Sequence, residues 1–275
     1  MQRTVLRTAL AALAGILLVA PNAGARTMDE IIKSGVIKVG VNPNLPPMSS
    51  LNTKGELEGF DIDIANIIAQ RLGVKAEFIT QESPQRVPNV VNDVTDISLG
   101  VTTRTTDRLK VVDFSVPLHT ESMATLLVDS PKVANVKKWQ DLNREDITLA
   151  DVRGVIGVQF AAKNLPKAKM LQVESSAEVI RAMAQGRADA LVENIGFFMA
   201  HTKNYPDVKW KVLPETIQHT YDGVVMKKGT DLRLWLNALL FELHGGGGTE
   251  NVIAGLWEKW WGQPMLDPVE VSPFF

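Results

Sequence analysis

The chain has 275 residues, no cysteine, and 29 Lys and Arg against 31 Asp and Glu. The near balance of charge argues against nucleic acid as a partner, and the absence of cysteine excludes disulfides, a thiol nucleophile and a cysteine-linked lipid anchor. The four histidines lie far apart in the sequence, and neither a phosphate-binding loop nor a Gly-x-Ser-x-Gly motif is present. We therefore expect no catalytic residue, no metal and no cofactor.

Residues 1–25 have the pattern of a secretory signal peptide. Two arginines precede an apolar run over residues 9–20, and Ala23-Gly24-Ala25 provides a small-residue cleavage site. The run is short and rich in alanine, which is not typical of a membrane span. We expect a mature chain that starts at Arg26 and is a soluble monomer of the bacterial periplasm.

The first part of the mature chain alternates predicted helices and strands. Clusters of β-branched residues indicate the strands, while apolar spacing of three and four residues with acidic first turns indicates the helices. In chain order we expect a helix from residue 27, a strand over 36–41, a loop over 42–48, a turn over 55–59, a helix over 61–72, a strand over 74–80, a helix over 88–94 and a strand over 96–101.

The alternation repeats in the second part. We expect strands over 123–128, 154–159, 188–192 and 223–226, and helices around 139–142 and over 175–186, 195–201, 231–244 and 249–261. Such alternation predicts an α/β fold with mostly parallel sheets flanked by helices. We expect two lobes, residues 26–123 with 223–275 and residues 124–222, joined by two crossing strands, with a ligand between them.

The segment from Asp96 to Arg108 is a candidate anion site. A predicted strand ends there in a run of hydroxyl side chains that leads into a helical segment over 106–110. If Thr105 caps this helix, Arg108 lies beside unpaired amide N–H groups, and together they would form a receptor for a carboxylate. A pairing of Arg108 with Asp107, or with solvent, remains the alternative.

Several motifs resemble one family. Gly-Phe-Asp-Ile-Asp-Ile at residues 59–64, continuing to Gly73, resembles the signature of the family 3 bacterial extracellular solute-binding proteins, the amino-acid receptors of ABC importers. The block over 96–108, Phe-Ser-Val-Pro at 114–117 and Leu-Trp-Glu-Lys-Trp-Trp-Gly at 256–262 are similar to later family motifs in the same order. The resemblance implies a two-lobed periplasmic-binding-protein-like fold and an importer permease as partner.

The resemblance also implies site residues. Arg108 would bind a ligand carboxylate, Thr103 would donate to it, and the backbone at Val101 would meet a ligand amine. The segment Ser-Pro-Gln-Arg from Ser83 to Arg86 is similar to the Ser-x-Asn-Arg element of acidic-amino-acid receptors, so these two residues would meet a side-chain carboxylate. A surface role for Arg86, capping the helix that follows, is the alternative.

Three positions depart from the family pattern. Met48 stands where an aromatic residue is common and would pack on a ligand without a π face. Ala162 removes a hydroxyl donor, and Asn194 stands where an Asp usually neutralises the ligand ammonium. Either the neighbouring Glu193 turns inward, or the ligand lacks an amine; as the alternative, Glu193 is an exposed acid that interacts with a helix start.

We therefore expect the protein to be the substrate-binding component of an ABC importer and not an enzyme. It would bind a small carboxylate-bearing solute, of which a polar or acidic amino acid is favoured. The alternative is a dehydratase, because a few proteins resembling this family are periplasmic dehydratases of prephenate-like acids. Glu193 or His119 would then act as general acid, although a loop histidine without a role is the simpler interpretation of His119. An exported sensor that docks a membrane protein is a third hypothesis.

Overall fold

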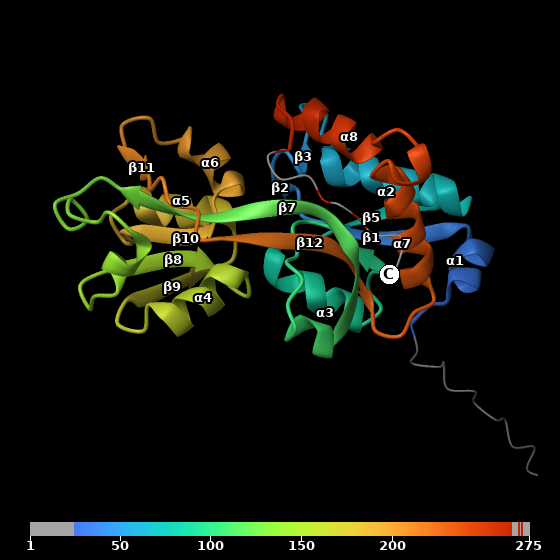
Figure 1. Ribbon diagram of the computed structural model, residues 1–275, viewed down its shortest axis with the longest axis horizontal. Coiled ribbons are helices and arrows are strands. Elements are labelled where there is room, and N and C mark those ends of the chain that lie inside the picture. Colours follow the sequence, from blue (N-terminus) through green and yellow to red (C-terminus); the bar gives the residue numbers. More distant parts are fainter. Residues whose placement is uncertain (1–24, 266–268, 270, 272–275) are drawn as a thin grey trace, which may run out of the picture.

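The computed structural model describes residues 25–265, 269 and 271, so the predicted signal peptide lies outside the described residues apart from Ala25. Two groups of elements lie at opposite ends of two long strands, β7 (Val112–Val128) and β12 (Gln218–Lys227), which run side by side (Figure 1). The terminal group contains the elements before β7 and after β12. The central group contains the elements between these strands.

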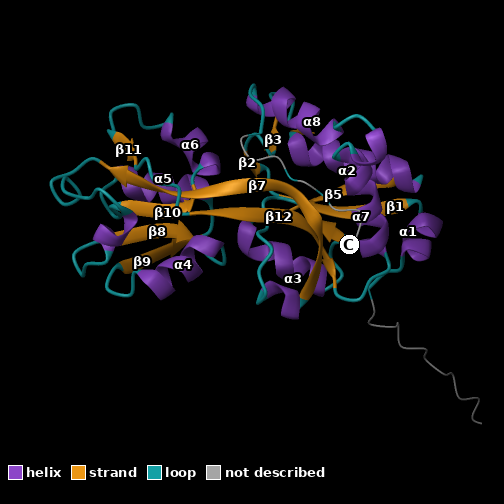
Figure 2. Cartoon of the chain, in the orientation of Figure 1, coloured by secondary structure: helices purple, strands orange, loops and turns teal. Residues whose placement is uncertain are grey.

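Helices cover the strands in both groups (Figure 2). The helices are α1 (Met28–Ser34), α2 (Phe60–Leu72), α3 (Arg86–Val91), α4 (Ile156–Asn164), α5 (Ser176–Ala184), α6 (Gly196–Thr202), α7 (Leu232–Leu243) and α8 (Val252–Trp261). The other strands are β1 (Val36–Val41), β2 (Asn44–Leu45), β3 (Ser49–Leu51), β4 (Leu57–Glu58), β5 (Lys75–Thr80), β6 (Ile97–Ser98), β8 (Thr148–Val152), β9 (Lys169–Val173), β10 (Ala190–Asn194) and β11 (Trp210–Val212). No helix between residues 25 and 265 is long and apolar enough to cross a membrane.

One nine-stranded sheet passes through both groups in the order β5-β1-β6-β12-β7-β10-β8-β9, with β11 beside β7. β1 is parallel to β5 and β6, and β8 is parallel to β9 and β10. β7 and β12 are antiparallel to each other and to their other neighbours in the sheet. The predicted α/β fold is confirmed, and the crossing strands are longer than expected, because β7 already begins at Val112.

Helix α2 illustrates how the sequence positions the sheet. Ile64, Ile68 and Leu72 lie on its buried face, as their spacing predicts. The helix ends at Gly73, whose φ of 73° is a left-handed conformation that glycine adopts without strain. The buried face of α2 contacts β1 and β5, and this packing fixes the strands whose carboxyl ends approach the candidate site.

Three local predictions are wrong. Residues 154–159 form no strand, because β8 already ends at Val152 and α4 follows, with Gly157 and Ala161 buried at helical spacing. The segment after Thr105 forms only a short 3-10 turn at Arg108–Lys110 instead of a helix. His119 is not in a loop but lies within β7, 1% exposed.

Candidate ligand-binding site

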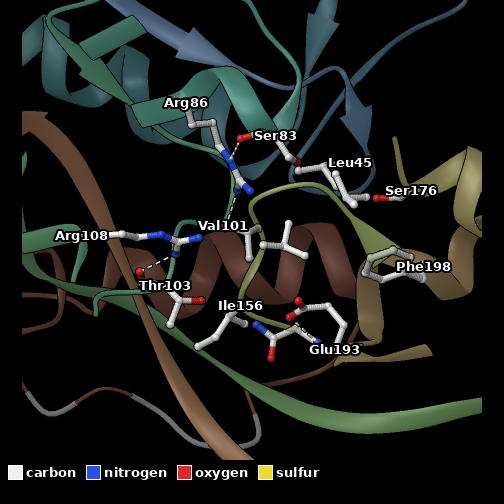
Figure 3. Close-up of a pocket in the computed structure, with 13 residues that line it drawn as sticks. Leu45, Ser83, Arg86, Val101, Thr103, Arg108, Ile156, Ser176, Glu193 and Phe198 are labelled. Carbon is white, nitrogen blue, oxygen red and sulfur yellow. Dashed lines mark hydrogen bonds between the residues drawn. The ribbon is translucent and has the colours of Figure 1, made fainter. Parts of the chain in front are cut away.

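A pocket lies between the two groups, beyond the ends of β8 and β10 and beside the loops that follow β5 and β6 (Figure 3). Ligands of open α/β sheets bind in this position. The pocket is partly open to solvent, and its cavity volume is about 30 Å³, room for one or two water molecules. The lining residues are Leu45, Ser83, Arg86, Val101, Thr103, Arg108, Val152, Val155, Ile156, Ser176, Glu193, Asn194 and Phe198.

Arg86 is buried in the wall that the terminal group contributes, with 4% of its surface exposed. Its Nε donates to the Ser83 carbonyl at 3.0 Å, and its Nη1 donates to the carbonyls of Gly100 and Val101. Val101 has a φ of 58°, which is unusual for a β-branched residue, so Arg86 stabilises a strained loop. Burial and the nearby charge of Arg108 lower the pKa of Arg86 to about 10, which leaves it protonated at neutral pH.

Arg108 is half-buried and contacts both walls of the pocket. Its backbone N–H donates to the Thr105 hydroxyl at 3.2 Å, and its Nη1 donates to the Thr103 carbonyl at 2.7 Å. Nη2 donates to the carbonyl of Gly154, in the central group, at 2.8 Å. The predicted Thr105 contact is therefore present even though the helix it was expected to cap is not.

Neither arginine has an acidic partner. Among the described residues, no Asp or Glu oxygen lies within 4.0 Å of the guanidinium group of Arg86 or Arg108. Figure 3 shows the two guanidinium groups converging beside Val101. Buried cations are normally paired with an anion, so this wall of the pocket is suited to an anionic ligand.

The opposite wall carries a pair of buried acids. Glu193, at the end of β10, accepts the N–H of Gly157 at 2.6 Å and the N–H of Asn194 at 2.8 Å, and is therefore not an exposed acid. A Cβ added to Gly157 would lie 2.8 Å from Glu193 Oε2 and closer still to Asp151 Oδ2, so the two carboxyl groups meet there. Burial raises the pKa of Glu193; burial and the Glu193 charge raise that of Asp151 well above its usual value.

Asn194 and Ser176 add polar groups to the same wall. The Asn194 side-chain amide exchanges hydrogen bonds with the Thr220 hydroxyl, at 3.0 Å from Nδ2 and 3.3 Å from Oδ1. Ser176, at the start of α5, presents a hydroxyl to the pocket. It restores a hydroxyl that the replacement at Ala162 was expected to remove, and Ala162 itself lies on α4, outside the pocket lining.

Further ionisable groups are buried behind the arginines. Burial raises the pKa of Asp61 to about 8 and that of Asp222 to about 7, although the positive charge of Arg86 opposes both shifts. Glu121, whose pKa burial raises well above its usual value, lies 3.5 Å from the Nδ1 atom of His119. Burial lowers the pKa of His119 to about 3, so this histidine stays neutral. Among the described residues, no group of His, Asp and Glu is arranged to hold a metal ion.

The structure brings together seven of the eight residues singled out from the sequence. They are Ser83, Arg86, Val101, Thr103, Arg108, Glu193 and Asn194. Met48 is the exception: it is fully buried in the hydrophobic core and lies outside the pocket lining. The sequence reasoning missed the apolar lining residues and Asp151, because residues 154–159 were assigned to a strand and the true strand, β8, was overlooked.

Comparison with known proteins agrees with this geometry. The profile of the bacterial extracellular solute-binding proteins, family 3, matches residues 37–263. The glutamine-binding protein of Geobacillus stearothermophilus is 31% identical, over 76% of this chain and 79% of that protein, and the cyclohexadienyl dehydratase of Pseudomonas aeruginosa is 25% identical, over 67% and 68%. The crystal structure of the ancestral amino acid-binding protein AncCDT-1, a precursor of cyclohexadienyl dehydratase, is 33% identical, with a TM-score of 0.73 over 85% of this chain and 98% of that chain. The chain therefore belongs to family 3 of the bacterial extracellular solute-binding proteins.

Proposed function

We propose that the protein is the periplasmic substrate-binding component of an ABC importer and binds a small carboxylate-bearing solute without transforming it. A polar or acidic amino acid is the favoured solute, and the name of the glutamine-binding relative supports a polar one. The lobes would be residues 26–123 with 223–275 and residues 124–222, and the partner would be the importer permease. The receptor would act as a monomer, exported by the signal peptide at residues 1–25.

One observation carries this proposal: Arg86 and Arg108 line the pocket without forming an ion pair with any acid of the described part of the chain. Each guanidinium has five N–H donors, and backbone carbonyls occupy only some of them. The two positive charges also repel each other, which contributes to the lowered pKa of Arg86. A carboxylate between them would relieve this repulsion and form charge-assisted hydrogen bonds.

The small volume of the pocket supports binding by closure. A cavity of about 30 Å³ that is partly open to solvent is small for an amino acid, so we expect the walls to lie further apart when a solute enters. The hydrogen bond from Arg108 to the Gly154 carbonyl joins the two walls and must break when they open. A ligand that contacts Arg108 and the opposite wall would favour the closed form, because it binds that form better than the open one.

A thermal-shift screen of amino acids and organic acids against the purified mature chain tests the proposal. A ligand at one hundred times its dissociation constant adds about 2.7 kcal/mol to the free energy of unfolding. We expect a rise in Tm with carboxylate-bearing solutes and none with their amides or esters. No rise with any carboxylate, or an equal rise with the uncharged derivatives, would overturn the proposed function.

A second candidate function is a dehydratase of a prephenate-like acid. Glu193 favours it, because this carboxyl group lines the pocket and burial raises its pKa, the direction that a general acid for a departing hydroxyl group needs. The similarity to the Pseudomonas enzyme supports the same idea. Incubation with candidate acids, followed by ultraviolet absorbance, separates the two functions, since a receptor binds its solute without forming product.

A further inference from the structure

The charges that face the pocket are unequal. Two guanidinium groups but only one carboxyl group, that of Glu193, belong to its lining. Both oxygens of this carboxyl already accept a backbone N–H, from Gly157 and Asn194. An ammonium group bound here would share Glu193 with these two N–H groups and would lie close to two guanidinium cations, which repel it.

The carbonyl acceptors beside the pocket already face the two arginines, and the carboxyl oxygens of Asp61, Asp151 and Asp222 that have no hydrogen-bond partner belong to buried residues outside its lining. The carbonyls of Gly100, Val101, Thr103 and Gly154 all accept from the two arginines. The Asn194 amide exchanges hydrogen bonds with Thr220. An ammonium group has three donors and no acceptor, so at these carbonyls it would lie beside a guanidinium cation and be repelled by it.

Donors, in contrast, remain available. Arg86 uses Nε and Nη1 on backbone carbonyls, which leaves its Nη2, and Arg108 uses Nη1 and Nη2, which leaves its Nε. The Ser83 hydroxyl accepts from the Asn42 amide at 3.3 Å, so its own hydrogen is free to donate. These donors fit carboxylate oxygens and repel a cation.

We propose that the pocket selects a small dicarboxylate without an ammonium group, with one carboxylate on Arg86 and Ser83 and the other on Arg108. This inference rests on the proposed function. It narrows the solute class to dicarboxylates without an amine, whereas the names of the relatives suggest amino acids. Glu193 and the adjacent Asp151 fit this class, because burial favours their neutral forms and a neutral Glu193 does not repel a dianion.

Calorimetric titration with matched pairs tests the proposal directly. Succinate and aspartate differ by one ammonium group, and so do glutarate and glutamate. We expect the amine-free member of at least one pair to bind at least tenfold more tightly at pH 6. If the amino member binds as tightly or more tightly, the dicarboxylate proposal is overturned while the proposed function stands. If none of the four binds, the dicarboxylate proposal is again overturned, and the broader carboxylate screen decides the proposed function.

Two variants give independent readouts. Asn194→Asp adds a negative charge to the lining. In this variant we expect the affinity for the amino acid, relative to that for its amine-free partner, to rise at least tenfold. Asn204→Asp, at an exposed position, is the control. Glu193→Gln removes the negative charge and is expected to tighten dicarboxylate binding severalfold at pH 8. If Glu193 instead receives a ligand ammonium, Glu193→Gln will weaken binding of the amino member, and that result overturns the proposal even if Asn194→Asp does not fold.

Discussion

The two walls of the pocket hold their charges in different ways. On the arginine side, Arg86 and Arg108 donate to backbone carbonyls and have no acid within ion-pairing distance in the part of the chain that the structure describes. On the acid side, Glu193 and Asp151 are buried beside each other and meet at Gly157, on a different element. Carbonyls do not neutralise a cation, whereas a proton neutralises a carboxylate.

This difference separates a permanent charge from an adjustable one. The guanidinium groups stay protonated over the physiological range even where burial lowers the pKa, as it does for Arg86. The carboxyl groups have raised pKa values, so their charge depends on pH over a range that lies above the usual one for a carboxyl group. The arginine side therefore determines that the ligand is an anion. The acid side determines how strongly the net charge of the pocket depends on pH.

The largest expected effect comes from breaking the arginine side. Arg108→Ala removes one guanidinium that a ligand carboxylate would contact, and we expect a loss of about 2–5 kcal/mol in binding free energy, the range for truncating one partner of a buried charge pair. Titration calorimetry with the best solute from the screen measures it. The control is Arg144→Ala, which removes an exposed arginine paired with Asp146 outside the pocket lining. Unchanged affinity in Arg108→Ala would show that Arg108 is not the anchor.

The acid side predicts a pH-dependent stability. The pKa of Asp151 is higher in the folded protein than its ordinary value of 3.8, so folding takes up a proton and stability falls as pH rises above that ordinary value. The slope for one proton is at most about 1.4 kcal/mol per pH unit. Asp151→Asn should remove the contribution of Asp151 to the pH dependence of stability. Asp61 and Asp222, whose pKa values are also raised, still contribute in this variant.

Denaturant unfolding at pH 5 and pH 8 measures this difference. We expect Asp151→Asn to be more stable than the wild type at pH 8 and closer to it at pH 5. The control is Asp146→Asn, at an exposed position. If the free energy of unfolding depends on pH equally in the wild type and in Asp151→Asn, Asp151 does not take up a proton on folding.

A smaller effect is expected from crowding the point where the two acids meet. Gly157→Ala places a methyl group against the Val192 carbonyl and the carboxyl groups of Asp151 and Glu193, and we expect it to destabilise the fold by about 1–3 kcal/mol. The matched control is Gly255→Ala in α8, where no atom lies within 4 Å of the added group and alanine favours the helix. Thermal unfolding of both variants compares them, and equal Tm values would refute the close packing at Gly157.

The same contrast explains what could be predicted from the sequence. Arg86 contacts a carbonyl three residues away and Arg108 contacts one five residues away, so two short motifs contain both arginines and part of their contacts. Their other hydrogen bonds, to Gly100, Val101 and Gly154, span 14, 15 and 46 residues. Glu193 contacts Gly157, 36 residues away, and Asp151 joins them only through the pairing of β8 with β10. The apolar run at residues 154–159 suits a strand as well as a helix start, so these long-range contacts were not predictable.

The smallest expected effect concerns the local contacts of the arginine side. The Thr105 hydroxyl accepts the backbone N–H of Arg108 at 3.2 Å, and its removal in Thr105→Ala should cost about 0.5–1 kcal/mol of binding by loosening the turn that carries Arg108. Thr106→Ala, at the exposed neighbouring position, is the control. Calorimetric titration of both variants tests whether a local contact positions Arg108. A loss as large as that of Arg108→Ala would instead indicate that the Thr105 hydroxyl itself binds the ligand, and no loss would indicate that the contacts of Arg108 with Thr103 and Gly154 suffice to hold it.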